Sequence, residues 1–300
     1  MRLVELGMLL LIMVIWGFNF PLVKLGVGEI PPILLMAIRF GIVALVMVPF
    51  VAVPRAQLRG LMVVSFVLGS LHFPTMFTGL KYLDSATVAI VSQVQVPFSA
   101  LLAWFFFGDV MSPARWLGLG VAIAGVVLIA GEPKLAGSFA DGIGPILLVV
   151  AGAFTWAFTI VLVKRIGQFD GLQLNAWTAA FVAPQLFLSS ALLETGQVAA
   201  LQAATWRTAL AIGFTAVFVS IVSHTLWYRL VQRHPVNTVM PFTLLAPVFG
   251  VLAGIVMLGE TLTWQGAVGS ALTLAGVAAI VLRKAPAPSA PPPASPGKAA

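Results

Sequence analysis

The sequence contains no cysteine and very few charged residues. The absence of cysteine excludes disulfides, thiolate metal sites and cysteine nucleophiles. Charged residues make up only 8% of the 300 residues, whereas soluble globular proteins carry about 25%. So few charges cannot cover a water-facing surface, and 60% of the residues are hydrophobic, with a mean hydropathy of +1.07. We therefore expect the lipid bilayer to be the solvent for most of the chain.

Missing patterns exclude several classes of function. There is no H-E-x-x-H pattern for a zinc protease, no G-x-S-x-G nucleophile elbow and no pair of aspartates inside an apolar segment. The net charge of +7 is scattered rather than clustered, so nucleic-acid binding is not expected. The loops are too short to form the filter of a channel. We expect no enzymatic activity and no cofactor or metal.

Ten apolar segments are present, and a helix needs about 20 apolar residues to cross a bilayer. The expected spans are 6–23, 33–53, 60–80, 86–107, 116–130, 142–163, 172–193, 208–228, 236–258 and 264–282. The first segment lacks a small-x-small cleavage pattern, so we expect it to be retained as a span. Residues 284–300 are rich in proline and alanine, which predicts a disordered tail.

The distribution of basic residues predicts the orientation. Of the 16 Lys and Arg residues, eleven fall on one side if the spans alternate, four fall on the other, and Arg39 is left inside a span. Basic residues concentrate on the cytoplasmic side of membrane proteins. This predicts that both termini lie in the cytoplasm.

Two parts of the sequence recur in the same order. The segment from Trp16 to Lys24 matches the segment from Trp156 to Lys164 in spacing and in its Leu-Val-Lys ending. Later, Gly108-Asp109, Gly118 and Gly125 match Gly259-Glu260, Gly269 and Gly276 with identical spacings. Small-residue spacing also arises by chance in helical membrane proteins, but two ordered matches favour duplication. We expect an all-α fold with a first repeat at 1–131 and a second at 142–283.

The number of spans in each repeat determines how the repeats are related. Five is odd, so the second repeat enters the membrane from the opposite face, and Lys24 and Lys164 accordingly fall on opposite sides. Inverted repeats are a transporter architecture, in which two pseudo-symmetric halves alternate access to a site near the midplane. The predicted function is therefore transport of a small molecule.

Several motifs resemble the EamA family of the drug/metabolite transporter superfamily over about residues 5–283. They are Trp16-Gly-Phe-Asn-Phe, Pro31-Pro32 followed by Arg39-Phe40, and Gly259-Glu260 followed by Leu262-Thr263 and Gln265-Gly266. Within the family, Gln93-x-Gln95 and the segment 241–248 resemble bacterial O-acetylserine/cysteine exporters. The resemblance implies an inner-membrane exporter with a cavity formed by spans 1, 3, 4, 6, 8 and 9. One departure is Asp109, where the family usually has Glu.

Polar and aromatic side chains inside the spans are the candidate substrate-binding residues, because polar groups in hydrocarbon need a partner or a task. They are Trp16, Asn19, Phe20, Arg39, His72, Gln93, Gln95, Trp156, Thr159, His224 and Tyr228. Each has a structural alternative. Arg39 either extends to the outer interface or attracts a carboxylate, Asn19 either bridges helices or binds substrate, and the histidines either pack or titrate during transport.

The composition of these candidates favours a small zwitterion. Amides, imidazoles, hydroxyls and one Arg among aromatics suit an amino acid or its acetylated precursor. A lipophilic cation would need an acidic residue and a nucleotide-sugar several basic ones; drugs or other metabolites remain the alternative. All nine carboxylates fall in loops or at span ends. Since proton relays are often intramembrane carboxylates, we expect either a facilitator or proton coupling through histidine.

Overall fold

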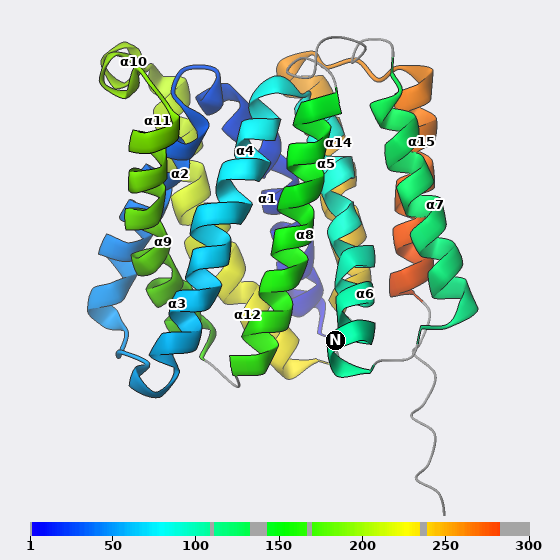
Figure 1. Cartoon of the computed structure of the whole chain (residues 1–300), viewed down its shortest axis with the longest axis horizontal. Helices are drawn as coiled ribbons and strands as arrows, with labels where there is room; N and C mark the ends of the chain where they lie inside the picture. Colours follow the sequence, from blue (N-terminus) through cyan, green and yellow to red (C-terminus); the bar gives the residue numbers. More distant parts are fainter. Residues whose placement is uncertain (1, 109–110, 133–142, 167–169, 235–238, 283–300) are drawn as a thin grey trace, which may run out of the picture.

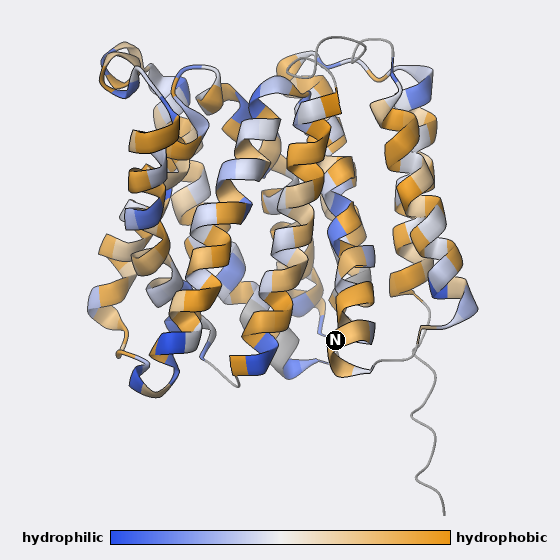
Figure 2. Cartoon of the chain, in the orientation of Figure 1, coloured by the Kyte–Doolittle hydropathy of each residue, from blue (hydrophilic) through white to orange (hydrophobic). Residues whose placement is uncertain are grey.

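The structure is a computed structural model that describes residues 2–108, 111–132, 143–166, 170–234 and 239–282. Within these ranges the regular elements are all helices. Nine of the described helical segments are long and apolar enough to cross a membrane, and Phe242–Leu258 is a shorter apolar helix. Counting this shorter helix, the described residues contain ten membrane-spanning segments, and the protein is an all-α membrane protein of two inverted five-helix repeats. The helices lie side by side and are largely apolar (Figures 1 and 2). The predicted fold class is confirmed.

The first repeat contains five spans, two of which are broken. The first span is α1 (Leu3–Val27), and the second is α2 (Pro32–Met47) with a 3₁₀ turn at Val48–Phe50. The third runs from a 3₁₀ turn at Arg55–Gln57 through α3 (Leu58–Phe66) and a π-helical turn at Val67–His72 into α4 (Phe73–Tyr82). The fourth comprises α5 (Ser85–Val91), a 3₁₀ turn at Ser92–Val94 and α6 (Gln95–Phe107), and the fifth is α7 (Pro113–Ala130).

The second repeat follows the same order. Its first two spans are α8 (Ile143–Ile166) and α9 (Gly171–Leu193). The next span is α11 (Trp206–Phe214), a π-helical turn at Thr215–Ser223 and α12 (His224–Arg233). A 3₁₀ turn at Met240–Leu244 leads into α14 (Leu245–Leu258), and α15 (Trp264–Val281) is last. A short helix that the sequence did not predict, α10 (Gln197–Ala203), lies at the end of the molecule that carries the α1–α2 turn (Figure 1).

The two π-helical turns occupy equivalent places in the repeats and have local causes. Pro74 follows the first turn, and it has no N–H to donate to the preceding helical turn. In the second turn, the hydroxyls of Thr215 and Ser223 donate to Ala211 O and Val219 O at 2.8 and 2.6 Å, which offers the backbone an alternative pattern. Such π-helical turns often occur at functional sites. Each of these turns ends at, or directly before, a histidine.

The final helices of the two repeats, α7 and α15, pack through reciprocal glycine contacts. A Cβ on Gly118 would lie 2.7 Å from Gly276 O, and a Cβ on Gly125 would lie 2.5 Å from Gly269 O. Only glycine allows the backbones this close approach. The same residues that matched in the sequence therefore meet across a pseudo-two-fold axis, in an antiparallel pair.

The helices that precede the two glycine-acid pairs end in the same way. Gly108 ends α6 at φ 69° and Gly259 ends α14 at φ 66°, both in the left-handed conformation that favours glycine. Asp109 lies outside the described residues, as does the predicted tail 284–300. Both ends of the described chain lie at the lower edge of the molecule, where α1 begins and α15 ends (Figure 1).

Candidate functional site

Two tryptophan–histidine pairs lie between the repeats. Trp16 on α1 contacts His224 on α12 with ring centroids 6.1 Å apart, and Trp156 on α8 contacts His72 with centroids 5.1 Å apart. The tryptophans are equivalent in the two repeats, and so are the histidines. Each tryptophan therefore contacts the histidine of the other repeat, and the interface contains the same pairing twice in opposite orientations.

A hydrogen bond holds one member of each pair in place. The indole Nε1–H of Trp16 donates to Ser223 Oγ at 2.8 Å, and the ring of Trp227 lies 5.1 Å away. His72 Nδ1 lies 2.8 Å from Gly152 O. Because a carbonyl oxygen only accepts, Nδ1 carries the proton, and Nε2 of the neutral ring is left as an acceptor.

Arg39 on α2 is buried, with an exposed fraction of 4%. Its Nε and Nη2 donate to Ser220 Oγ at 3.1 and 3.0 Å, and its guanidinium carbon lies 5.0 Å from the ring centroid of Phe40. The side chain points toward the second repeat and not toward the membrane–water interface. In the described part of the chain it forms no ion pair. A buried cation held by a hydroxyl has strong residual affinity for an anion.

Aromatic contacts link Arg39 to the pair formed by His72 and Trp156. The ring of Phe40 lies 4.5 Å from that of Phe73, and Phe73 lies 4.8 Å from His72. On the other side, the π-helical turn Thr215–Ser223 accepts from Arg39 through Ser220 and from Trp16 through Ser223. Arg39 and both pairs thus form one polar and aromatic band between the repeats.

Asn19 and Phe20 lie on α1 near Trp16. The Oδ1 atom of Asn19 is buried and accepts no hydrogen bond from the described residues. A buried carbonyl oxygen without a donor is costly, so this atom is a natural acceptor for a donor on a ligand. Phe20 is half-buried and packs against the main hydrophobic core.

The remaining predicted residues are less connected. Gln93 is buried on the 3₁₀ turn of the fourth span, and Gln95 is half-buried at the start of α6. Thr159 is buried and its hydroxyl donates to Thr155 O at 2.9 Å within α8. The described hydrogen bonds and ring contacts do not join these three side chains to the central band. The side chain of Tyr228 lies outside the described residues.

Sequence reasoning missed the serines that hold the band together. Ser220 accepts from Arg39, and Ser223 accepts from Trp16. Their spacing of three, about one helical turn, in a mostly apolar span is the signal that could have identified them. No cluster of three or more metal-ligating side chains occurs among the residues that the structure describes.

On the predicted outer face, three carboxylates each cap a helix of the other repeat. Glu29, after α1, accepts from Thr205 N–H at 2.9 Å and from the hydroxyls of Thr205 and Thr208 at 2.6 and 2.7 Å. Glu194, after α9, accepts from the N–H groups of residues 33 and 34 at the start of α2, at 2.8 and 3.0 Å. Glu260, after α14, accepts from those of residues 85 and 86 at the start of α5, at 2.6 and 2.9 Å.

These caps satisfy helix N-termini and place negative charge at the positive ends of helix dipoles. At Glu29 the hydroxyl groups of Thr205 and Thr208 and the Thr205 N–H donate to the charged carboxylate. These hydrogen bonds lower the pKa of the Glu29 carboxyl to about 2. We call the contacts of Glu29, Glu194 and Glu260 the cross-repeat caps. They tie the two repeats together at one end of the molecule.

Lys24 adds a fourth connection on the same face. Its ammonium donates to the carbonyls of Leu80, Lys81 and Leu83 at 3.0, 2.8 and 2.7 Å, at the C-terminal end of α4. Glu260 holds the start of α5 just beyond. The turn between α4 and α5 is therefore held from α1 on one side and from the end of α14 on the other.

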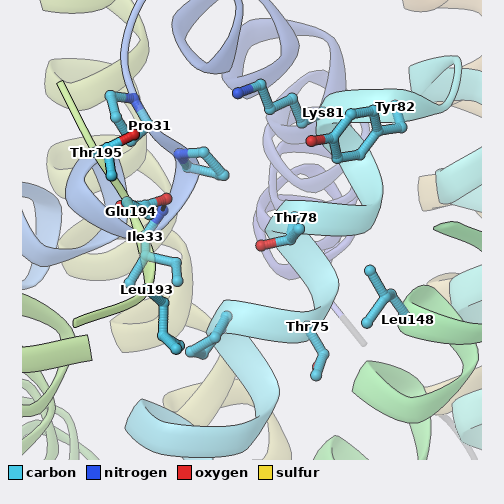
Figure 3. A pocket seen from close by; sticks show the side chains of 12 residues that line it. Pro31, Ile33, Thr75, Thr78, Lys81, Tyr82, Leu148, Leu193, Glu194 and Thr195 are labelled. Carbon is cyan, nitrogen blue, oxygen red and sulfur yellow. Dashed lines mark hydrogen bonds between the residues drawn. The ribbon is translucent and has the colours of Figure 1, made fainter. Parts of the chain in front are cut away.

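Two cavities open at opposite ends of the molecule. One lies on the predicted outer face, and we call it the outer cavity: it has a volume of about 480 Å³ and lies between the start of α2, the end of α9 and α4 (Figure 3). The other lies on the predicted inner face, and we call it the inner cavity: it has a volume of about 260 Å³ and lies between the start of α1 and α12. The lining of the outer one is Pro31, Pro32, Ile33, Pro74, Thr75, Thr78, Lys81, Tyr82, Leu148, Leu193, Glu194 and Thr195.

Equivalent residues line the two cavities. Leu148 and Met8 each precede their repeat's tryptophan by eight residues, and Lys81 and Arg233 each follow their repeat's histidine by nine. The inverted repeat thus relates the two cavities, one at each end, with the buried band between them. This arrangement is that of a transporter with inverted repeats.

Comparison with known proteins also indicates a membrane transporter. The model of the EamA-like transporter family matches residues 4–131 and 143–282. A "Probable amino-acid metabolite efflux pump" of Salmonella typhimurium is 31% identical over 275 residues, covering 89% of this chain and 91% of that protein; one of the same name from Escherichia coli K12 is 28% identical with the same coverage. A solved crystal structure aligns with a TM-score of 0.64 at 22% identity, over 94% of this chain and 98% of that one, and shows the fold alone.

The chain is a multi-pass membrane transporter. It belongs to the EamA-like transporter family.

Proposed function

We propose that this protein exports small amino-acid-like metabolites, of the cysteine and O-acetylserine type, across the bacterial inner membrane with both termini in the cytoplasm. The observation that carries the proposal is the buried guanidinium of Arg39, whose described partners are the hydroxyl of Ser220 and the thioether of Met36, with no carboxylate. A substrate carboxylate supplies the missing negative charge. Charge-assisted bonds of this kind are the strong ones in a low-dielectric interior.

The rest of the band suits the other groups of an amino acid. The Oδ1 atom of Asn19, which has no donor among the described residues, is an acceptor for an ammonium group. The rings of Trp16 and Trp156 are apolar surfaces for a short side chain. Relatives that are 31% and 28% identical carry the name of amino-acid metabolite efflux pumps, which supports the same class.

Alternating access is the mechanism that this geometry favours. Arg39 and His72 in the band are at most 7% exposed, so a solute reaches these side chains only when helices move apart. The outer and inner cavities are the two ends of the route. The π-helical turns at Val67–His72 and Thr215–Ser223 adjoin the band and can absorb such movement, because their hydrogen bonding departs from that of the α-helix.

Purified protein in liposomes tests this function. Vesicles loaded in turn with L-cysteine, O-acetyl-L-serine and other amino acids are assayed by counterflow, next to a panel of lipophilic cations. We expect counterflow of at least one amino acid, loss of that activity in Asn19→Ala, and full activity in Leu45→Ala, whose side chain is 79% exposed. Counterflow of the cations alone would favour the second candidate, an exporter of drugs or other metabolites.

A further inference from the structure

We propose that the outer cavity is itself a binding site for the α-amino acid group, in which Lys81 takes the carboxylate and Glu194 takes the ammonium. The inference rests on the proposed function and adds a second binding position, at the outer end of the route and distinct from the band around Arg39. It predicts that a zwitterion pauses here before it leaves or after it enters.

Opposite charges stand on opposite walls of this cavity. Lys81 is at the end of α4, and Glu194 is across the opening, directly after α9; Thr78 precedes Lys81 by three residues on α4 and lies on the same wall (Figure 3). An α-amino acid carries a carboxylate and an ammonium on one carbon atom. These two charges are complementary to those of Lys81 and Glu194. The volume of about 480 Å³ lies within the range of roughly 300–1,000 Å³ that is usual for small-molecule sites.

The ammonium of Lys81 is free to bind. In the described part of the chain its Nζ atom makes no hydrogen bond or ion pair, and it lies 5.9 Å from the ring centroid of Tyr82. The backbone beneath it is fixed, because Lys81 O accepts from Lys24 at 2.8 Å. An exposed cation on a fixed backbone is suited to bind a carboxylate without rearrangement of the helix.

Glu194 keeps one acceptor position beyond its role as a cap. A carboxylate offers about four lone-pair directions. Three are used by described donors: Oε2 accepts from Leu34 N–H and from Ser190 Oγ, and Oε1 accepts from Ile33 N–H. The fourth direction, on Oε1, can accept from an ammonium group while the cap stays in place.

The inverted repeat gives independent support that this cavity belongs to the transport route. Its counterpart in the other repeat is the inner cavity, where Arg233 stands at the position equivalent to Lys81 and Met8 at that of Leu148. Imperfect packing on one face would not be expected to produce a second cavity on the opposite face with a cation at the equivalent position. Both mouths therefore present a cation to an arriving solute.

A single introduced thiol tests the site directly, because the chain has no cysteine. The variant Thr78→Cys in lipid nanodiscs is alkylated with a charged maleimide, alone or with each amino acid of the counterflow panel, L-leucinamide or N-acetyl-L-leucine. We expect at least one zwitterion to slow alkylation several-fold, and the amide and the N-acetyl compound, which each lack one charge, to have no effect. The control Val198→Cys, on an exposed part of α10, should show no protection.

Charge variants then assign the protection to Lys81. In the Thr78→Cys background, Lys81→Met should raise the half-protecting concentration about tenfold, the equivalent of one charged hydrogen bond, whereas Lys81→Arg should keep it within about threefold. Ser190→Ala, which removes one donor to the cap and leaves the charge of Glu194, should leave protection intact.

The outcomes separate this inference from the proposed function. No protection by any amino acid, equal protection by the amide, or protection that survives Lys81→Met would each overturn the site. Counterflow with no protection would keep the transport function and reject the site. Protection by amino acids without counterflow would keep the site and reject the transport function.

Discussion

The indole of Trp16 and the imidazole of His224 meet edge to face at 6.1 Å, although they come from the first span of one repeat and the third span of the other. Trp156 and His72 repeat the contact at 5.1 Å. The second contact is tilted rather than edge to face, and the two pairs also differ in a hydrogen bond: Trp16 donates its N–H to Ser223, and no described acceptor receives that of Trp156.

This difference predicts unequal effects of equal substitutions. Trp16→Phe removes a partly buried hydrogen bond, so we expect a lower unfolding temperature, corresponding to about 1 kcal/mol; Trp156→Phe should cost less. Thermal unfolding in detergent, followed by size-exclusion chromatography, measures both. In a double-mutant cycle Ser223→Ala should add little to Trp16→Phe. Fully additive effects would show that this hydrogen bond is not formed.

Arg39 is expected to serve transport at the expense of stability. In Arg39→Met the buried charge is replaced by an apolar side chain of similar length, which is often neutral or stabilising. We expect the unfolding temperature to stay the same or rise while counterflow of carboxylate-bearing solutes falls by about a hundredfold, since a buried charged interaction is worth about 3 kcal/mol or more. Retained counterflow in Arg39→Met would show that Arg39 does not bind the substrate carboxylate.

The cap at Glu29 predicts a defined dependence of stability on pH. Its pKa is about 2 in the folded protein and 4.5 ordinarily. The cap therefore stabilises the fold fully above pH 4.5 and loses its effect as the pH falls from 4.5 toward 2. The difference in unfolding temperature between the wild-type protein and Glu29→Gln should be constant from pH 7 to 5 and shrink below pH 4.5. A difference that is the same at pH 3 and pH 7 would contradict this.

The α7–α15 crossing predicts opposite results for two glycines on one helix. Gly125→Ala places a methyl group against Gly269 O and Thr273, so we expect a loss of about 1–3 kcal/mol from overpacking. Gly120, on the exposed side of the same helix, has no neighbour within 4 Å of a Cβ, and Gly120→Ala should be neutral or stabilise by up to about 1 kcal/mol. Expression level and unfolding temperature compare the two.

Coupling to protons, if it occurs, should depend on the two histidines. None of the described carboxylates lies at the middle of a span, so His72 and His224 are the remaining titratable groups of the central band besides Arg39. Counterflow is measured across a series of imposed pH gradients. We expect His72→Gln with His224→Gln to abolish any accumulation driven by the gradient. Strong accumulation that survives both substitutions would reject coupling through histidine.

Much of the fold could be predicted because hydrophobicity and repeated spacing are properties of the sequence itself. The ten spans and the inverted repeat follow from apolar length and from the matched tryptophan and glycine positions. The π-helical turns could not be predicted, because they depend on a local contest between side-chain hydroxyls and backbone donors. The helix α10 is short and half polar, with no strong apolar period.

The candidate site was predictable in its residue types and less so in its contacts. His72 and His224 could be recognised as equivalent, but their partners lie in the other repeat and depend on how the repeats dock. The carboxylates of Glu29, Glu194 and Glu260 fell correctly outside the spans, yet nothing near them in sequence reveals which helix each one caps. Arg39 could be placed inside a span, but not against Ser220.

The clamp on the α4–α5 turn constrains how the outer end can open. Lys24 donates to the carbonyls at the end of α4, and Glu260 accepts from the first N–H groups of α5. The hairpin is therefore attached at its tip to two neighbouring helices. Force applied at the tip is passed on to α1 and α14 rather than absorbed by a loose loop. We therefore expect the hairpin and these two helices to move together when this end of the molecule opens.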